Sequence, residues 1–384
     1  MVILHILSSD DKYGSAQCFL ELLMHEIKIN GITPIVITPK NNDINNKCNE
    51  LGVKNYVIKY RQFQIPKHDP TPIFILKYCY HTMMYYLMNY AAENKIISII
   101  ENDNVNIVHT NSSVIDIGSN VAKRTGLINF WHLREFGKED FNFYSAKAGF
   151  LNSMNACQNR FLAISEVVRQ TWIKRGLNPN KIITVYDGVD ANRFVPKQNI
   201  ENDNHKIKIV MCGSFCVAKN QKLLIKAVNE LSQRDRENVI IDFYGKTDGT
   251  YFYESQKLVE EYRLENIVSF KGYINNVPEM LPKYDVGVLC SRAEAFGRVT
   301  AEYMMASLCT IAPASGANVE IIDDGCGLLY KEGDIHELSS IISSIIKGMV
   351  DYRSIGKKAR SKAIDKYNIN ENADKIVNQF ILKR

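Results

Sequence analysis

Two glutamates stand in the stretch SRAEAFGRVTAEYM (residues 291–304), with seven residues between them. An apolar run at residues 286–290 precedes them and predicts a buried strand, and a helical pattern follows from about Arg298 to Ala306. Glu294 then lies in the loop before the helix, and Glu302 lies about one turn inside it. A fully helical segment would separate them by about 12 Å along its axis. Carboxylates bind vicinal hydroxyls well, so this spacing suits hydroxyl groups on either side of a phosphate. Two ordinary surface glutamates are the alternative.

The turn between the two glutamates could itself bind an anion. Phe296 and Gly297 lead into the helix, and the amides of Gly297, Arg298 and Val299 would form its N-terminus. The free amides and the dipole of a helix N-terminus favour negative charge. A phosphate between the two carboxylates is therefore expected at this turn.

A second glycine-bearing loop, MCGSFCVAKNQK (residues 211–222), follows another predicted strand. Gly213 ends the strand, and Lys219 stands just before a predicted helix. A lysine at that end is unfavourable for the helix dipole, and a bound anion would correct the mismatch. A solvated loop lysine is the alternative. A third loop, DDKYGSAQ (residues 10–17), places Gly14 and Ser15 at the start of a helix, which by itself is a weak sign of phosphate binding.

Short apolar, β-branched runs alternate with helical patterns along the whole chain. This alternation predicts parallel sheets covered on both faces, and two such arrays predict two Rossmann-like domains of the α/β class. The expected strands are Val2–Leu7, Thr33–Ile37, Ile107–Thr110, Phe161–Ile164, Ile207–Met211, Val239–Phe243, Val286–Leu289 and Thr310–Ala312. The expected helices include Ala16–Lys28, Val167–Arg175, Gln221–Gln233 and His336–Lys347.

The 384 residues favour two domains of ordinary size. The polar, turn-rich stretch YDGVDANRFVPKQNIENDN (residues 186–204) marks the boundary. We expect an N-terminal domain at 1–190, a linker at 191–205, a C-terminal domain at 206–365, and a final helix at 366–384 that returns to the first domain.

Composition limits the classes of partner. The formal charge is +5, and its excess lies in residues 1–200, with 22 basic against 17 acidic residues. This bias suits phosphate or lipid headgroups, or is ordinary surface lysine, and no DNA- or RNA-binding pattern accompanies it. The nine scattered cysteines fit reduced thiols in cytosol, and the opening residues predict a buried strand, not a signal peptide.

The stretch from Ile73 to Ile100 is rich in tyrosine and apolar residues but is interrupted by charges, so it falls short of a transmembrane span. It predicts one or two amphipathic helices. Its tyrosines, with Lys59, Arg61 and Lys67 upstream, would suit a helix at a membrane interface, and packing on the domain's own sheet is the alternative.

Taken together, the three loops resemble those of the retaining nucleotide-sugar glycosyltransferases of family 4, which have the GT-B fold of two Rossmann-like, doubly wound domains facing a central cleft. The resemblance covers nearly the whole chain and is most specific at EAFGRVTAE. The supporting blocks, in order, are WHLREFG, FLAISEVVRQ, VYDGVDANRF, MCGSFCVAKNQKLLIKA, VSFKGYINNV and NVEIIDDGCGLLY.

The resemblance implies a role for each matched residue. Glu302 would bind the ribose hydroxyls, and Glu294 the hydroxyls of the donor sugar. Lys219 and the Gly297–Val299 amides would hold the diphosphate, and the base would lie near Tyr273 and Ile274. The residues completing the implied site are Gly14, Ser15, Ser214, Phe296, Arg298 and His132, the last matching the family's first-domain histidine near the donor sugar.

Three positions depart from the family pattern. Ser214 replaces a common arginine, which removes one diphosphate cation, and we expect Arg298 to compensate. Asp187 stands where asparagine is common, and Ser307 where glycine is usual.

The resemblance implies a retaining hexosyltransferase that moves a sugar from a nucleoside diphosphate, expected to be UDP, without a protein nucleophile or a metal. The expected acceptor is a saccharide, such as a polyprenyl-diphosphate-linked one, in bacterial capsule or exopolysaccharide synthesis. The expected location is cytoplasmic, peripheral on the inner face of the membrane. A nucleotide-sugar 2-epimerase and a non-catalytic nucleotide-sugar-binding subunit remain alternatives. A dehydrogenase is disfavoured, because no GxGxxG follows either first strand.

Overall fold

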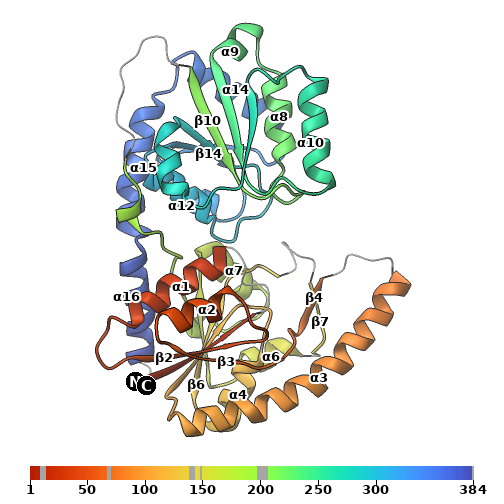
Figure 1. Cartoon of the computed structure of the whole chain (residues 1–384), viewed down its shortest axis with the longest axis vertical. Helices are drawn as coiled ribbons and strands as arrows, with labels where there is room; N and C mark the ends of the chain where they lie inside the picture. The colour runs from red at the N-terminus through yellow and green to blue at the C-terminus, as the bar shows by residue number, and fades with distance from the viewer. Residues whose placement is uncertain (9–13, 67–70, 138–142, 148, 197–205, 383–384) are drawn as a thin grey trace. The chain divides into compact units, whose positions relative to one another are not determined.

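The computed structural model describes residues 1–8, 14–66, 71–137, 143–147, 149–196 and 206–382. It divides into two compact units, one made of Met1–Asp187 with Ile369–Arg384 and the other of Gly188–Asn368 (Figure 1). Of the stretch expected to be a linker, residues 191–196 belong to the second unit, and residues 197–205 lie outside the described part. Each unit is built on its own parallel sheet.

The first unit has a seven-stranded sheet in the order β3-β2-β1-β5-β6-β8-β9, with every neighbouring pair parallel. The four strands expected in this half are present. The strands are β1 (Val2–Leu7), β2 (Thr33–Thr38), β3 (Lys54–Val57), β5 (Ile107–Asn111), β6 (Ile128–Leu133), β8 (Asn159–Ala163) and β9 (Ile182–Thr184), and a separate antiparallel pair joins β4 (Gln64–Pro66) to β7 (Phe143–Ser145).

Helices cover both faces of this sheet, as the apolar strands require. The helices are α1 (Gly14–Glu26), α2 (Asp43–Glu50), α3 (Thr71–Asn102), α4 (Ile117–Thr125), α6 (Phe150–Met154), α7 (Glu166–Lys174) and α16 (Ile369–Leu382), with a short turn at Pro179–Lys181. A similar turn at Ala191–Arg193 belongs to the second unit. On one face, Leu22 of α1 and Phe380 of α16 pack on Ile3 and Phe130. On the other, Ile96 of α3 and Val121 of α4 belong to a separate core cluster.

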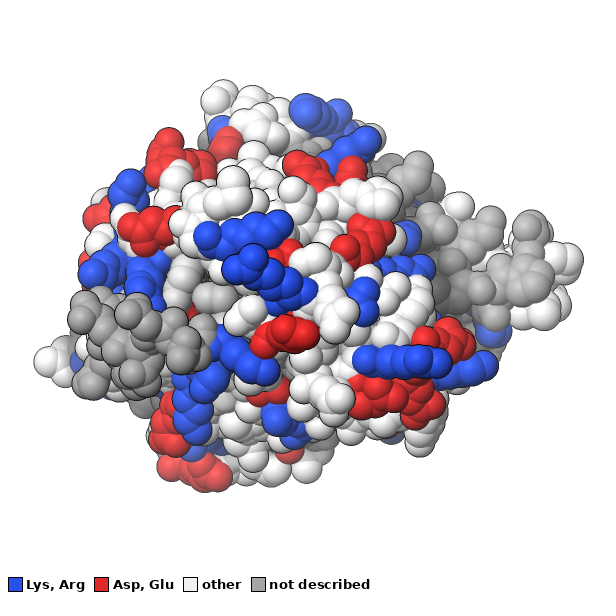
Figure 2. All heavy atoms as spheres, turned by 90° about the horizontal axis from the view of Figure 1, so that it is seen from above, with Lys and Arg blue, Asp and Glu red and all other residues white. Residues whose placement is uncertain are grey.

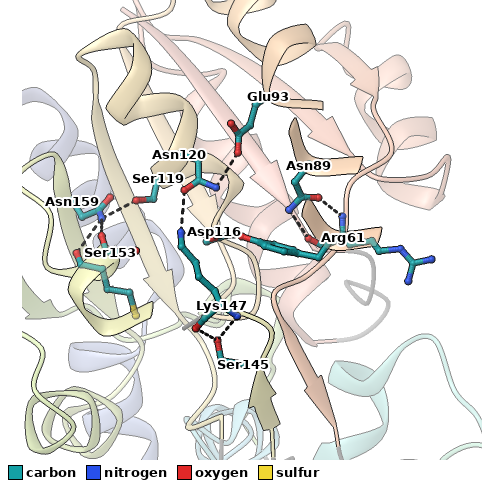
Figure 3. Close-up of polar contacts among 12 residues, drawn as sticks. Arg61, Asn89, Glu93, Asp116, Ser119, Asn120, Ser145, Lys147, Ser153 and Asn159 are labelled. Atoms are coloured by element: carbon teal, nitrogen blue, oxygen red, sulfur yellow. Dashed lines mark hydrogen bonds and ion pairs between the residues drawn. The ribbon is translucent and has the colours of Figure 1, made fainter. Parts of the chain in front are cut away.

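Helix α3 is one continuous helix of 32 residues, where the sequence predicted one or two. Its inner face is anchored by polar contacts (Figure 3). The Asn89 side chain bonds both backbone groups of Arg61, at 2.8 and 3.0 Å, and the Tyr85 hydroxyl donates to Asp116 Oδ2 at 2.7 Å. Lys147 Nζ approaches the same carboxylate at 2.9 Å. Packing on the unit's own sheet therefore accounts for the inner face of α3.

The outer face of α3 is exposed and apolar. Its exposed large side chains include a series spaced three and four residues apart: Ile73, Leu76, Tyr80, Met83, Leu87 and Tyr90. Across the described residues, neither this helix nor another has the length and apolar character needed to cross a bilayer.

The second unit has a six-stranded parallel sheet in the order β12-β11-β10-β13-β14-β15. The strands are β10 (Ile207–Cys212), β11 (Val239–Tyr244), β12 (Val268–Gly272), β13 (Val286–Val288), β14 (Cys309–Pro313) and β15 (Leu328–Tyr330). The helices are α8 (Gln221–Asn229), α9 (Gln233–Glu237), α10 (Thr250–Glu261), α11 (Val277–Met280), α12 (Arg298–Met305), α13 (Asn318–Ile321), α14 (Ile335–Ile346) and α15 (Tyr352–Lys366), with a short turn at Leu281–Lys283. On the face drawn in Figure 2, acidic and basic side chains are interspersed without a field of one sign.

One predicted helix was too long. The sequence predicted a helix at Gln221–Gln233, but α8 ends at Asn229 and a separate helix starts at Gln233. The Ser232 side chain accepts a hydrogen bond from the Asp235 amide, which makes Ser232 the N-cap of the new helix. The N-cap at Ser232 therefore starts α9, so the helical pattern of the sequence is divided between two helices.

Candidate functional site

Lys219 and Glu294 form an ion pair although 75 residues separate them. Lys219 Nζ lies 2.5 Å from Glu294 Oε1, which joins the loop after β10 to the loop after β13. Burial lowers the pKa of Lys219, but the charge and the hydrogen bond of Glu294 outweigh it, so the pKa lies above its ordinary value. The ammonium is therefore charged at neutral pH, and its side chain remains one-third exposed.

The loop that carries Lys219 is shaped by two glycines. Gly213 has a φ of +151°, and a side chain at Gly245 would come within 2.0 Å of the Gly213 carbonyl oxygen. Gln221 Nε2 donates to the carbonyl oxygens of Gly213 and Ser214, at 3.2 and 3.0 Å. Ser214 therefore lies in a loop whose backbone is held from both sides, with Lys219 at its end.

Glu294 is positioned by a glycine that sequence reasoning missed. Gly316 has a φ of +59°, and a side chain there would lie 2.6 Å from the carbonyl oxygen of Glu294. That same oxygen accepts a hydrogen bond from the Ala317 amide at 2.8 Å. The dipeptide Ser315-Gly316, which follows β14 after Ala314, was the available signal, because such pairs mark turns.

Helix α12 begins at the expected turn. Gly297 is its N-cap in the left-handed conformation, at a φ of +81°, with no side-chain cap. The amides of Arg298 and Val299 open the helix. Phe296 is buried against the ring of Tyr367, at 5.6 Å between centroids, so its side chain holds the turn in place.

Arg298 contacts the second predicted glutamate. Its Nε lies 3.1 Å from Glu302 Oε1, and its Nη1 donates to the Gly188 carbonyl oxygen at 3.2 Å. Both side chains are mostly buried. The expectation that Arg298 compensates for Ser214 at a diphosphate stays a prediction, and the structure gives Arg298 a contact that orients Glu302.

Tyr303 ties α12 to the strand that precedes the Lys219 loop. Its hydroxyl accepts a hydrogen bond from the Cys212 amide at 2.7 Å, and its ring fills the space that a side chain at Gly287 would occupy. Burial raises the pKa of Cys212 and Cys290 to about 12, so both remain thiols at neutral pH. Neither Tyr303 nor Gly287 was predicted as a site residue from the sequence.

The ends of β11 and β12 lie at the same edge of the sheet. The Gly213 amide donates to the Tyr244 carbonyl oxygen at 2.8 Å, and the Gly245 amide donates to the Gly272 carbonyl oxygen at 3.0 Å. Tyr273, which is exposed, and Ile274, which is half-buried, follow directly. The second unit thus contains two contacting pairs, Lys219 with Glu294 and Arg298 with Glu302. Tyr273 and Ile274 lie just beyond the carboxyl end of β12, at the same edge of the sheet.

The other predicted residues belong to the first unit. Gly14 and Ser15 open α1, and the rest of that loop, Asp10–Tyr13, lies outside the described residues. His132 is fully buried near the end of β6. Burial lowers the pKa of His132 well below its ordinary range, and the Arg134 guanidinium adds to this effect, so the ring is neutral at neutral pH.

Two departures from the expected pattern have structural partners. Asp187 Oδ1 and Oδ2 each accept a hydrogen bond from Arg134 Nη1 at 2.8 Å, so an acid there matches a buried cation. Ser307 adopts a φ of +64°, the left-handed conformation that favours glycine. Within the ranges the structure describes, no group of three or more acidic, histidine or cysteine side chains could hold a metal ion.

Comparison with known proteins agrees with this architecture. Residues 193–362 match the family model "Glycosyl transferases group 1". Among curated proteins, N-acetyl-alpha-D-glucosaminyl L-malate synthase of Bacillus anthracis is 25% identical over 53% of this chain and 54% of its own length. The putative glycosyltransferase EpsD of Bacillus subtilis is 28% identical over 46% of this chain and 48% of its own length. The chain thus spans about half the length of these relatives.

The fold extends further than the sequence similarity. The crystal structure of Anabaena HepE in complex with UDP aligns over 99% of both chains, with a TM-score of 0.79 at 16% identity. The two units therefore have the GT-B fold, which confirms the fold expected from the sequence.

Proposed function

We propose that this chain, whose residues 193–362 form a group 1 glycosyltransferase domain, is a retaining glycosyltransferase of family 4 that transfers a sugar from a UDP-sugar to an acceptor hydroxyl. The observation that carries the proposal is the Lys219–Glu294 pair at the carboxyl edge of the second sheet. A neighbouring pair, Arg298 and Glu302, lies at the start of α12. Together the two pairs offer the partly exposed ammonium group of Lys219 and the carboxylates of Glu294 and Glu302.

The chemistry follows from the charges. When the bond between the sugar and the phosphate breaks, positive charge develops on the sugar and negative charge on the diphosphate. Lys219 has three N–H donors and the pair with Glu294 uses one, so the ammonium can bind a phosphate oxygen while it holds Glu294. Glu294 would meet the sugar hydroxyls. The acceptor hydroxyl adds on the face the phosphate leaves, and the phosphate takes its proton.

The remaining roles are those that the family resemblance implies. Glu302, oriented by Arg298, would bind the ribose, with the base near Tyr273 and Ile274. Ser214 and the amides of Gly297 and Val299 would contact the diphosphate by backbone, as would Gly14 and Ser15 from the first unit. His132 would serve the donor sugar. The proposal assigns the stabilisation of charge to Lys219 and the amides, so turnover is expected to survive EDTA.

The first experiment is UDP or GDP release from a panel of UDP- and GDP-sugars without an acceptor. We expect slow hydrolysis of one UDP-sugar. Binding without turnover, even with lipid-linked acceptors, would instead indicate a nucleotide-sugar-binding subunit, and an inverted anomeric configuration in the product would refute retention. Binding of no sugar nucleotide would overturn the whole proposal.

Replacing Glu302 with glutamine is expected to weaken donor affinity about 10- to 100-fold, because a charged hydrogen bond contributes about 1.5–3 kcal/mol. The donor KM and a calorimetric Kd for UDP measure it. The matched control is Glu332→Gln, an exposed glutamate of the same unit that has no assigned role. Equal Kd values for the two variants would contradict the ribose role.

The proposed acceptor is a lipid-linked saccharide of a surface polysaccharide, reached from the cytoplasmic face of a membrane. The exposed apolar series on α3 supports this, since it includes Leu76 and Leu87, exposed by 74% and 63%, and two tyrosines. Arg61 stacks on the ring of Tyr80 at 5.7 Å, which puts a basic group beside the series. Aromatic rings flanked by basic groups suit the interface of an anionic bilayer.

The double substitution Leu76→Asp and Leu87→Asp is expected to abolish sedimentation with vesicles of anionic phospholipid, because two exposed leucines that would insert into the bilayer are replaced by charges that the lipid repels. Acceptor-free donor hydrolysis should not change. Met349→Asp, at an equally exposed apolar residue of the second unit, is the control. Unchanged sedimentation, or a wild-type dimer that the double variant dissociates, would refute the membrane role.

A further inference from the structure

Three histidines lie in a row inside the first unit. His5 of β1 is in register with His109 of β5, and His132 of β6 is in register with Asn111, two residues beyond His109. Side chains at these positions share one face of the sheet. The rings of Phe19 and Phe380 pack against the row from α1 and α16, and all three histidines are fully buried.

The row starts at a carboxylate, and successive members approach one another at 2.9 to 3.4 Å. Glu26, the last residue of α1, is fully buried, and its Oε2 lies at an ion-pair distance of 2.9 Å from His5 Nε2, without the angles of a hydrogen bond. His5 Nδ1 lies 2.9 Å from His109 Nδ1. His109 Nε2 lies 3.4 Å from His132 Nδ1. We call these four residues the histidine row.

The Glu26 carboxylate determines which nitrogen of each histidine donates and which accepts. A neutral imidazole has one N–H donor and one bare acceptor nitrogen, and burial holds the pKa of both His109 and His132 well below the ordinary range. A bare nitrogen lone pair would be repelled by the Glu26 oxygen 2.9 Å away, so a neutral His5 carries its proton on Nε2 and leaves Nδ1 bare. His109 then donates from Nδ1, and its bare Nε2 receives the Nδ1–H of His132. The last nitrogen, His132 Nε2, is left without a proton.

We propose that Glu26, His5 and His109 are positioning residues that hold His132 in the Nδ1–H tautomer, so that Nε2 accepts a hydrogen bond from a substrate hydroxyl. This inference rests on the proposed function, since a sugar donor supplies the hydroxyl. The three residues touch no substrate and act only through the ring of His132.

The free end of the row is built for a hydroxyl. Among the described residues, neither His132 Nε2 nor Asn111 Nδ2 has a hydrogen-bond partner, and both are buried. Arg134 Nε donates to Asn111 Oδ1 at 2.8 Å, which leaves the amide NH₂ as the unused group. His132 Nε2 is an acceptor and Asn111 Nδ2 is a donor on neighbouring strands, so a hydroxyl matches both, whereas an anion or a cation would satisfy only one of them.

The tautomer can be measured without activity. Imidazole nitrogen-15 shifts distinguish a protonated nitrogen from a bare one, the chain has only eight histidines, and His132→Gln assigns the His132 signals. We expect protonated Nδ1 and bare Nε2 in the wild type. His109→Phe, which keeps an aromatic ring beside Phe380, and Glu26→Leu should each abolish this preference. A protonated Nε2 in the wild type, or no change in either variant, would overturn the inference.

Kinetics supply the second readout. His109→Phe is expected to lower kcat about 10- to 100-fold with little change in donor KM, because the ring of His132 remains but its tautomer is no longer set. Glu26→Gln keeps an acceptor oxygen and should retain both the tautomer and most of kcat, even if Glu26→Leu fails to fold. His81→Phe, the same change outside the row, is the control and should match the wild type. Loss in Glu26→Gln equal to that in Glu26→Leu would contradict the tautomer role.

The outcomes separate this inference from the proposed function. The predicted tautomer without turnover of any donor would refute the function and the substrate contact but not the positioning of His132. Turnover with a tautomer that the variants do not affect would refute the inference alone. A His132 Nε2 signal that does not shift when a turned-over donor is added would show that a trapped water fills the position, and would overturn the substrate contact.

Discussion

Replacing Lys219 with methionine is expected to lower kcat for donor hydrolysis about 100- to 1,000-fold, the loss typical of removing one preorganised group that stabilises developing negative charge. Methionine keeps much of the stem that packs on Gly213 but cannot neutralise a diphosphate. Because the charge appears as the bond breaks, kcat should fall more than KM rises. Steady-state UDP release measures both constants.

The control is Lys226→Met, an exposed lysine of the neighbouring helix α8, which should leave both constants unchanged. Glu294→Gln should also reduce kcat, and the double variant should lose less than the product of the two single losses, because the residues contact each other. Strictly multiplicative losses would show that the pair does not act as a unit. Wild-type kcat in Lys219→Met would remove the main support for the mechanism.

The raised pKa of Lys219 adds a pH expectation. The ammonium gains its partner on folding, so the stability from the pair is fully present below the ordinary lysine value of 10.5 and is lost only as the pH rises through the higher folded value. Deprotonation of Lys219 therefore should not limit turnover at or below pH 9.

Replacing Gly245 with alanine is expected to be the most damaging single-methyl change at the site. The added Cβ would lie 2.0 Å from the carbonyl oxygen of Gly213 and 3.1 Å from the amide nitrogen of Ser214, and both are backbone atoms that cannot rotate away. Overpacking of this kind costs about 3 kcal/mol, which for a unit of this size lowers Tm by about 6–12 °C. Calorimetric melting measures the shift.

Turnover should fall as well, because relief of the clash moves the loop that carries Lys219. The control is Gly333→Ala, where a side chain meets nothing within 4 Å and only the positive φ of +79° opposes it. In Gly333→Ala, Tm should fall by less than half of the decrease in Gly245→Ala, and kcat should equal that of the wild type. A Gly245→Ala protein with wild-type Tm and kcat would show that the two loops are not packed as described.

Local pattern predicted the secondary structure of this chain well. The strand VILHIL was predicted at Val2–Leu7 and is observed there, and the helix predicted at His336–Lys347 is observed at Ile335–Ile346. A run of apolar residues or a helical period is a property of neighbours in sequence. The helix predicted to reach Gln233 was wrong because a single N-cap, Ser232, outweighed the continuing pattern.

The candidate site was predictable in its residue types but not in its contacts. Glu294, Glu302 and Lys219 were recognised because loops after parallel strands collect ligand groups. Gly245, Gly316 and Tyr303 were missed, because their importance depends on atoms that come near them only in the folded chain. The sequence does not show which atoms lie close to the Cα of a glycine in the folded chain.

The sequence by itself thus determined the α/β class, the alternation of strands and helices, and which loops carry carboxylates, a lysine and glycines. Only the tertiary structure decided that Lys219 meets Glu294 and that Glu26 begins a row ending at His132. The physical reason is that such contacts depend on strand order and register, which bring together residues 23, 75 and 104 positions apart. Strand order and register are set by the packing of the whole sheet, whereas the types and spacing of residues are set locally.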